Sequence, residues 1–118
     1  MLQILKYNRF EIANNIEICR TMTSQALGLM FRSLIPANYA MIFVMKKPAS
    51  VGIHMLFMRF PIDVIFLNEE KIIVAMASLK PWIGHKATKN IKYIIETNSG
   101  MIERYGLSIG GKMEFEGI

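Results

Sequence analysis

"GIHMLFMRFPIDVIFLN", residues 52–68, is the densest run of apolar side chains in the chain, yet it contains His54, Arg59 and Asp63. Pro61 restricts the residue before it to extended geometry and lacks a backbone donor, so it predicts a bend or strand boundary. The stretch therefore reads as two strands joined at a corner. We expect Arg59 and Asp63 to be displayed at that corner, and only His54 to lie within a strand.

Apolar segments on both sides of this stretch predict the rest of a sheet. An opening hairpin is expected from residues 2–7 and 15–20, with the turn-prone residues 8–15 between them. The later apolar segments, at residues 40–45, 71–79, 93–98 and 112–116, complete about seven short strands. The polar segment 46–50 is expected to bound a strand, and residues 81–92 to form a loop. Ile72–Leu79 reads as a strand covered on both faces.

Two short helices are predicted. Residues 21–33 place Leu27, Met30 and Phe31 at the spacing of a buried helix face. The second helix follows Ser99, which is expected to cap it, and ends at Gly106. The predicted fold class is α+β: a compact, strand-rich single domain, built on a mainly antiparallel sheet or small barrel.

Length and composition favour one domain over residues 1–118, because a chain of 118 residues has no room for a second core. Hydrophobic residues make up 53% of the chain and charged residues 19%, which argues against disorder. The formal net charge is +5, but the basic residues are scattered, so we do not expect nucleic-acid binding.

The single cysteine, Cys19, excludes an intramolecular disulfide and suits a reducing compartment. The first ten residues lack the apolar core of a signal peptide. No window approaches the roughly 20 uninterrupted apolar residues of a spanning helix. We therefore expect a cytoplasmic protein with no membrane span.

His54 and Asp63 are the candidate catalytic residues. Imidazole exchanges protons near neutral pH, and a carboxylate facing the same cleft would form a proton-transfer pair with it or orient its tautomer. The alternatives stay open: His54 as a hydrogen-bonded core or edge residue, and Asp63 as the partner of Arg59 in a structural ion pair.

The candidate ligand-binding residues are Arg32, Arg59, Lys80, Trp82 and Glu96. Trp82 follows a proline in a loop, so it forms either a lid over the core or the flat wall of a binding site. Lys80 beside it is suited to contact an anion. No metal site or cofactor is expected, because the two histidines of the chain are far apart in sequence and no ligand motif includes them.

Several stretches together closely resemble the bacterial and archaeal family called domain of unknown function 192. They include "GLMFR" (28–32), "IHMLFMRFPIDVIFL" (53–67), "LKPW" (79–82) and "IIETNSG" (94–100), and the match runs in order from Ile16 to Phe115. The resemblance implies a compact, strand-rich single domain with a short helix near residues 24–32 and another after Gly100. It implies no activity.

Three functions are consistent with these residues. The first is a non-catalytic module that binds a small ligand or a peptide, because basic groups beside an aromatic wall suit recognition. The second is a small enzyme that uses His54 and Asp63 as its proton-transfer pair. The third is a structural or protein-interaction domain that pairs through an exposed strand edge.

Overall fold

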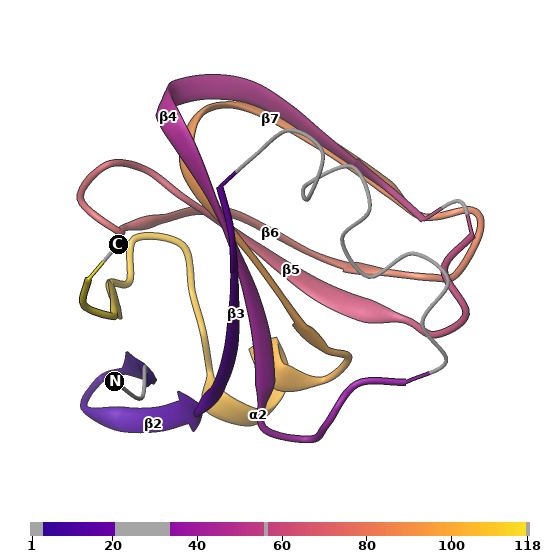
Figure 1. Cartoon of the computed structure of the whole chain (residues 1–118), viewed down its shortest axis with the longest axis horizontal. Coiled ribbons are helices and arrows are strands. Elements are labelled where there is room, and N and C mark those ends of the chain that lie inside the picture. The colour runs from indigo at the N-terminus through magenta and orange to yellow at the C-terminus, as the bar shows by residue number, and fades with distance from the viewer. Residues whose placement is uncertain (1–3, 21–33, 56, 118) are drawn as a thin grey trace.

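The computed structural model describes residues 4–20, 34–55 and 57–117, and its described part is built almost entirely of strands (Figure 1). Five strands form one sheet in the order β3-β4-β7-β5-β6, and three form a smaller sheet in the order β2-β1-β8. All neighbours are antiparallel except β3 and β4, which are parallel. The elements are β1 Leu5–Tyr7, β2 Phe10–Ala13, β3 Asn15–Cys19, β4 Tyr39–His54, β5 Ile62–Leu67, β6 Ile73–Leu79, β7 His85–Asn98, α2 Met101–Tyr105 and β8 Met113–Glu114.

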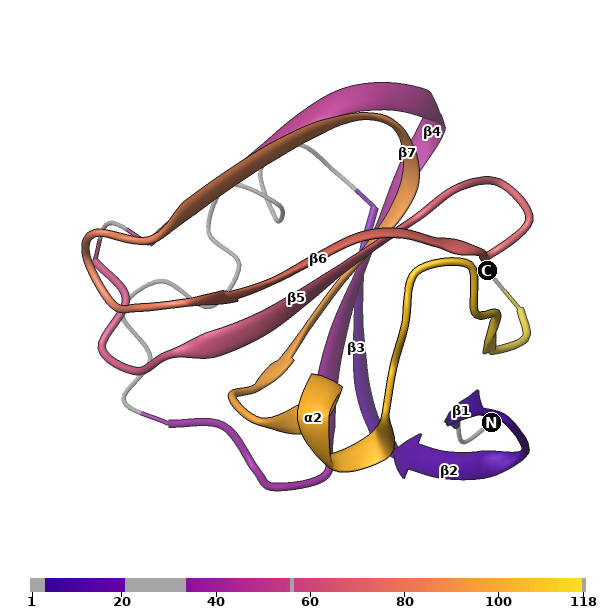
Figure 2. The same cartoon turned by 180° about the vertical axis from the view of Figure 1, so that it is seen from behind.

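Two apolar clusters cover the two faces of the five-stranded sheet, and β5 contributes to both. Ile65 and Leu67 pack on the face that also meets the smaller sheet and α2. Val64 and Phe66 pack on the other face. Every residue of β5 is buried, as alternation in a strand with two covered faces requires. Figure 2 shows α2 and the chain that follows it lying between the larger sheet and the N-terminal strands.

The strand covered on both faces was predicted at Ile72–Leu79, and this assignment is wrong. In the structure these residues form β6, the last strand of the larger sheet, and the middle of β6 is only partly buried. The strand covered on both faces is instead β5, an interior strand of the sheet that β6 and β7 flank on either side. A hairpin turn joins β5 to β6, with the carbonyl of Asn68 accepting the backbone hydrogen bond from Lys71 at 3.0 Å.

The predicted opening hairpin forms with a different second strand. β1 pairs with β2, which lies inside the segment predicted as a turn. Asn8 and Arg9 make the connection, with φ angles of 51° and 70°, the signs that a two-residue hairpin turn requires. β3 instead joins the larger sheet as the parallel neighbour of β4.

β4 merges two predicted strands into one, because residues 46–50 continue the strand instead of bounding it. Pro48 is tolerated there for two reasons. β3 pairs with β4 only as far as Phe43, so one edge of β4 has no described partner strand beyond that point. The register with β7 also shifts between Val44 and Ala49, where a proline removes no ladder hydrogen bond.

β7 begins at His85, inside the segment predicted as a loop. Residues 85–88 pair in register with residues 51–54 of β4. The sequence predicted a loop because these residues are mostly polar. They can be polar within a strand because the first part of β7 is exposed or only partly buried. The strand predicted at 112–116 is confirmed in its alternation, since Met113 and Phe115 are buried and the residues between and beside them are exposed.

The second predicted helix is confirmed as α2, and it ends at Gly106 with a φ of 62°. Its predicted cap is wrong, because Gly100 occupies the N-cap position and Asp63, from β5, accepts the hydrogen bonds of its backbone. The first predicted helix lies in residues 21–33, outside the described residues. The described part is therefore mostly β, and the α+β class with two helices is not confirmed. It contains no helix long and apolar enough to cross a membrane.

Candidate functional site

Two chain connections meet at the end of the molecule opposite the labelled termini (Figure 1). One joins β4 to β5 and the other joins β6 to β7. They expose three large apolar side chains: Phe57 at 44%, Trp82 at 52% and Ile83 at 74% of full exposure. The rings of Phe57 and Trp82 pack edge to face, with centroids 5.3 Å apart. We call Phe57, Trp82 and Ile83 the aromatic tip.

Both aromatic residues of the tip have a left-handed backbone. Phe57 has a φ of 64° and Trp82 a φ of 67°. The backbone N–H of Ile83 donates to the carbonyl of Pro81 at 2.8 Å, so Trp82 is the central residue of a γ-turn with positive φ. That form of the γ-turn is rare and strained, and a bulky residue in the left-handed region costs about 1–3 kcal/mol. Such strain persists only where surrounding structure enforces it.

Backbone hydrogen bonds between the two connections enforce this conformation. Met55 donates to the carbonyl of Gly84 at 2.9 Å, and Trp82 donates to the carbonyl of Met55 at 2.8 Å. Gly84 also donates to the carbonyl of Lys80 at 3.0 Å. A Cβ at Gly84 would lie 2.8 Å from the backbone N and O of Lys80, so only glycine closes this turn without displacing backbone.

Arg59 and Lys80 belong to the same two connections as the aromatic tip, and both are exposed. Each lies two residues from a tip aromatic: Arg59 follows Phe57, and Lys80 precedes Trp82. Three predicted ligand-binding residues, Arg59, Lys80 and Trp82, therefore belong to the same pair of connections. An exposed aromatic surface with guanidinium and ammonium groups beside it is suited to ligands that join an apolar or aromatic group to an anion.

Asp63 does not stand at the exposed corner, as was predicted; it is fully buried. One carboxylate oxygen accepts a hydrogen bond from Ser78 Oγ at 2.7 Å. The other accepts from the backbone N–H groups of Gly100 at 3.1 Å and Ile102 at 2.9 Å. These contacts tie β5 to β6 and to the start of α2, and they indicate a structural role. The proton-transfer pair with His54 stays a prediction.

Glu96, another predicted ligand-binding residue, is buried at 5% exposure in the middle of the larger sheet. It lies between Met41 of β4 and Val64 of β5. Burial raises the pKa of the Glu96 carboxyl from 4.5 to about 7. This carboxyl is therefore close to half protonated at neutral pH, and its role in ligand binding stays a prediction.

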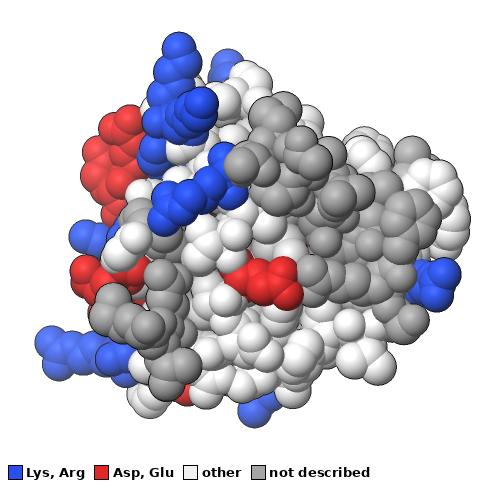
Figure 3. Space-filling view, viewed as in Figure 1, with Lys and Arg blue, Asp and Glu red and all other residues white. Residues whose placement is uncertain are grey.

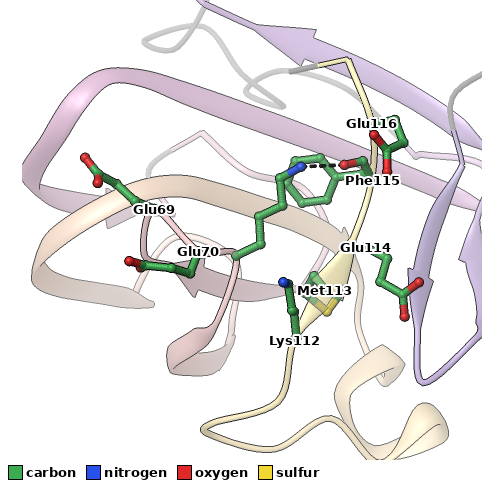
Figure 4. Close-up of a pocket in the computed structure, with 8 residues that line it drawn as sticks. Glu69, Glu70, Lys112, Met113, Glu114, Phe115 and Glu116 are labelled. Carbon is green, nitrogen blue, oxygen red and sulfur yellow. Dashed lines mark hydrogen bonds between the residues drawn. The ribbon is translucent and has the colours of Figure 1, made fainter.

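A hollow of about 500 Å³ lies between the β5–β6 turn and the C-terminal segment, and Figure 4 shows the side chains that line it. Glutamates from both segments stand around it. The ammonium of Lys71 donates to the carbonyl of Phe115 and lies 4.2 Å from the centre of the Phe115 ring. We assign Lys71 to holding the C-terminal segment against the sheet.

Two members of the tip, Phe57 and Ile83, were missing from the predicted set. Phe57 lies in the densest apolar run of the chain, so its pattern indicated core. Gly84 is the sequence feature that could have indicated this turn, because a glycine shortly after a Pro-Trp pair is typical of a tight turn. Arg32, the remaining predicted residue, lies outside the described residues.

The structure defines a class of protein: a strand-rich domain with two sheets and an apolar tip formed by two adjoining connections. The same fold occurs in a solved protein of unknown function from Novosphingobium aromaticivorans, with a TM-score of 0.80 and 24% identity over 97% of this chain and 84% of that one. A solved protein from Sinorhizobium meliloti has a TM-score of 0.83 and 20% identity over 96% of this chain and 91% of that one. At these identities the likeness shows the fold.

Sequence comparison identifies the family. Residues 5–115 match the model of DUF192, described as an uncharacterized ACR family. UPF0127 protein PF1050 from Pyrococcus furiosus is 36% identical over 107 residues, covering 89% of this chain and 90% of that protein. The chain belongs to the DUF192 family, which confirms the resemblance found in the sequence. Membership of an uncharacterized family assigns no activity, so the function is argued from the site.

Proposed function

We propose that the chain is a non-catalytic binding module whose recognition element is the aromatic tip. Its ligand is a small molecule or a peptide that carries an anionic group beside an apolar or aromatic group. The tip would contact the apolar part, and Arg59 and Lys80 the anion. The observation that carries the proposal is the γ-turn at Trp82, because a half-exposed tryptophan held with positive φ gives the fold little in return for its strain.

Charge supports an anionic ligand without favouring nucleic acid. The chain carries a net charge of +5, which attracts anions. On the face shown in Figure 3, the basic side chains stand in separate groups, with acidic side chains beside several of them. A nucleic-acid backbone needs a continuous basic surface. A compact anion beside a ring fits this distribution better.

The alternatives have weaker support. The contacts of Asp63 with Ser78 and the start of α2 already give that carboxylate a structural role, which disfavours the enzyme that uses it with His54. Pairing through a strand edge would use an edge such as that of β6, one of the two outermost strands of the larger sheet. No feature of β6 matches the strain and exposure of the aromatic tip. The chain has a single cysteine, Cys19, which is buried, and a chain with one cysteine suits the cytoplasmic location we propose.

A peptide titration followed by NMR tests the proposal. Trp82 is the only tryptophan, so the protein has one indole N–H resonance. The probe is a short peptide with one aromatic residue between aspartates, and its control has lysines in place of the aspartates. We expect the acidic peptide to shift the indole resonance in a saturable manner and to raise the melting temperature. An indole resonance that the acidic peptide leaves unchanged would overturn the proposal.

Two variants localise the response. Trp82→Ala removes the aromatic tip's largest side chain and should abolish the rise in melting temperature. Phe10→Ala is the matched control, because Phe10 is an exposed aromatic residue at 70% exposure but belongs to β2 in the smaller sheet. It should leave the rise unchanged. Equal loss in both variants would show that binding is a general effect of exposed aromatic surface.

A further inference from the structure

The register of the larger sheet brings together the only two histidines of the chain. His54, the last residue of β4, lies directly opposite His85, the first residue of β7. The next pair outward is Met55 and Gly84, which a backbone hydrogen bond of 2.9 Å joins. Bonded and non-bonded pairs alternate in an antiparallel ladder, so the two histidines form a non-hydrogen-bonded pair. In such pairs the side chains are closest, with Cβ atoms about 4.5–5.5 Å apart.

Both histidines are exposed and project from the same face of the sheet. The neighbouring pair on that face is Gly52 and Ala87, the two smallest residue types. A Cβ added at Gly52 would meet no atom within 4 Å. These small residues help to line a shallow hollow of about 620 Å³ that extends along the strands to Ser50 and Lys89.

Two lysines of β7 lie close to His85 in the chain, and they stand on opposite faces of the strand. Lys86 follows His85 directly, so it projects from the opposite face of β7. Lys89 lies on the same face as His85, at the far end of the hollow. Two exposed histidines therefore lie directly opposite each other on paired strands, next to the smallest residue types. This preorganisation lowers the entropy lost when both bind one ion.

We propose that His54 and His85 together bind one divalent first-row transition-metal ion. Neutral imidazole is the commonest protein ligand for such ions, and Cu²⁺ is held more tightly than Ni²⁺ or Zn²⁺ by a given set of nitrogen ligands. The other coordination positions of the ion would face the hollow and take water or the donor atoms of a ligand. The site does not depend on the function proposed for the aromatic tip. The sequence predicted no metal site because the two histidines are far apart in the chain, and this proposal departs from that prediction.

Metal titration of the purified full chain tests this site. The two histidines give two sets of imidazole C–H resonances, and Zn²⁺ should shift both sets together at a ratio of one ion to one protein. Cu²⁺ should quench the fluorescence of Trp82, which lies three residues before His85, in a saturable manner.

Single-residue variants test whether both histidines bind the metal ion. His54→Gln and His85→Gln should each weaken Cu²⁺ binding about tenfold or more, since loss of even an outer partner of a metal ligand costs 10–100-fold. Lys86→Gln is the control: it alters a neighbour on the opposite face and should bind Cu²⁺ as the unaltered chain does. Two results would overturn the proposal: a histidine variant with unchanged affinity, or Zn²⁺ shifts confined to one histidine. Both histidines are exposed, so we expect both variants to fold, and circular dichroism checks this.

Discussion

Two neighbouring regions of the larger sheet use unusual residues in opposite ways. Near the start of β5, Asp63 is a buried carboxylate whose oxygens accept hydrogen bonds from Ser78 and from the first turn of α2. In the two connections beside it, Phe57 and Trp82 are exposed aromatic residues with left-handed backbones. The first arrangement stabilises the fold. The second costs free energy and gains little burial, so its origin is better explained by recognition than by stability.

The largest effect should come from Asp63→Ala. The substitution removes the acceptor of three hydrogen bonds and leaves backbone donors of α2 buried without a partner, so we expect a loss of about 3–5 kcal/mol in unfolding free energy. Urea unfolding followed by circular dichroism measures it. Ser78→Ala removes one of the three donors and should cost about 1 kcal/mol. If Asp63→Ala lost only as much unfolding free energy as Ser78→Ala, the result would contradict a structural role for Asp63.

Glu96 should make stability depend on pH. Its carboxyl has a pKa of about 7 in the folded chain and 4.5 in the unfolded one, so between these values the folded state holds a proton that the unfolded state releases. Stability should therefore fall as the pH rises from about 4.5 to 7, by on the order of 3 kcal/mol.

Glu96→Gln isolates this effect, because glutamine stays neutral at every pH. Urea unfolding at a series of pH values should show that the variant loses the slope between pH 4.5 and 7 and is more stable than the unaltered chain above pH 7. Glu103→Gln changes an exposed carboxyl in α2 and should keep the slope. A slope that persists in Glu96→Gln would assign it to other groups.

Gly84→Ala should cost about 1–3 kcal/mol, because the new Cβ would lie 2.8 Å from backbone atoms of Lys80. The fluorescence spectrum of Trp82 should change as the turn shifts. Gly52→Ala is a matched glycine control, since its Cβ would meet nothing within 4 Å. Its unfolding free energy and spectrum should match those of the unaltered chain. Equal effects at both glycines would contradict the account of the turn.

Sequence patterns predicted the parts of this molecule that depend on local alternation and turn chemistry. The corner at Pro61, the end of α2 at Gly106 and the alternation of Met113 with Phe115 all follow from such local signals. Asp63 was wrongly predicted at an exposed corner, and His85 was not predicted as the neighbour of His54, because these contacts are set by pairing across the sheet. Ser78, Gly100 and Ile102 meet Asp63 only once β5, β6 and α2 are assembled, and His85 meets His54 only once β4 and β7 are in register.

Thermal unfolding of Trp82→Gly and Trp82→Ala, each with and without the acidic aromatic peptide, tests the central claim most directly. Glycine is normally the less stable of the two residues, but it adopts a φ of 67° without strain. We predict that Trp82→Gly is more stable than Trp82→Ala by about 1 kcal/mol, and that the peptide stabilises neither variant while it stabilises the unaltered chain. An alanine variant as stable as the glycine variant, or a peptide effect that survives in both, would contradict the claim that the aromatic tip is held under strain for recognition.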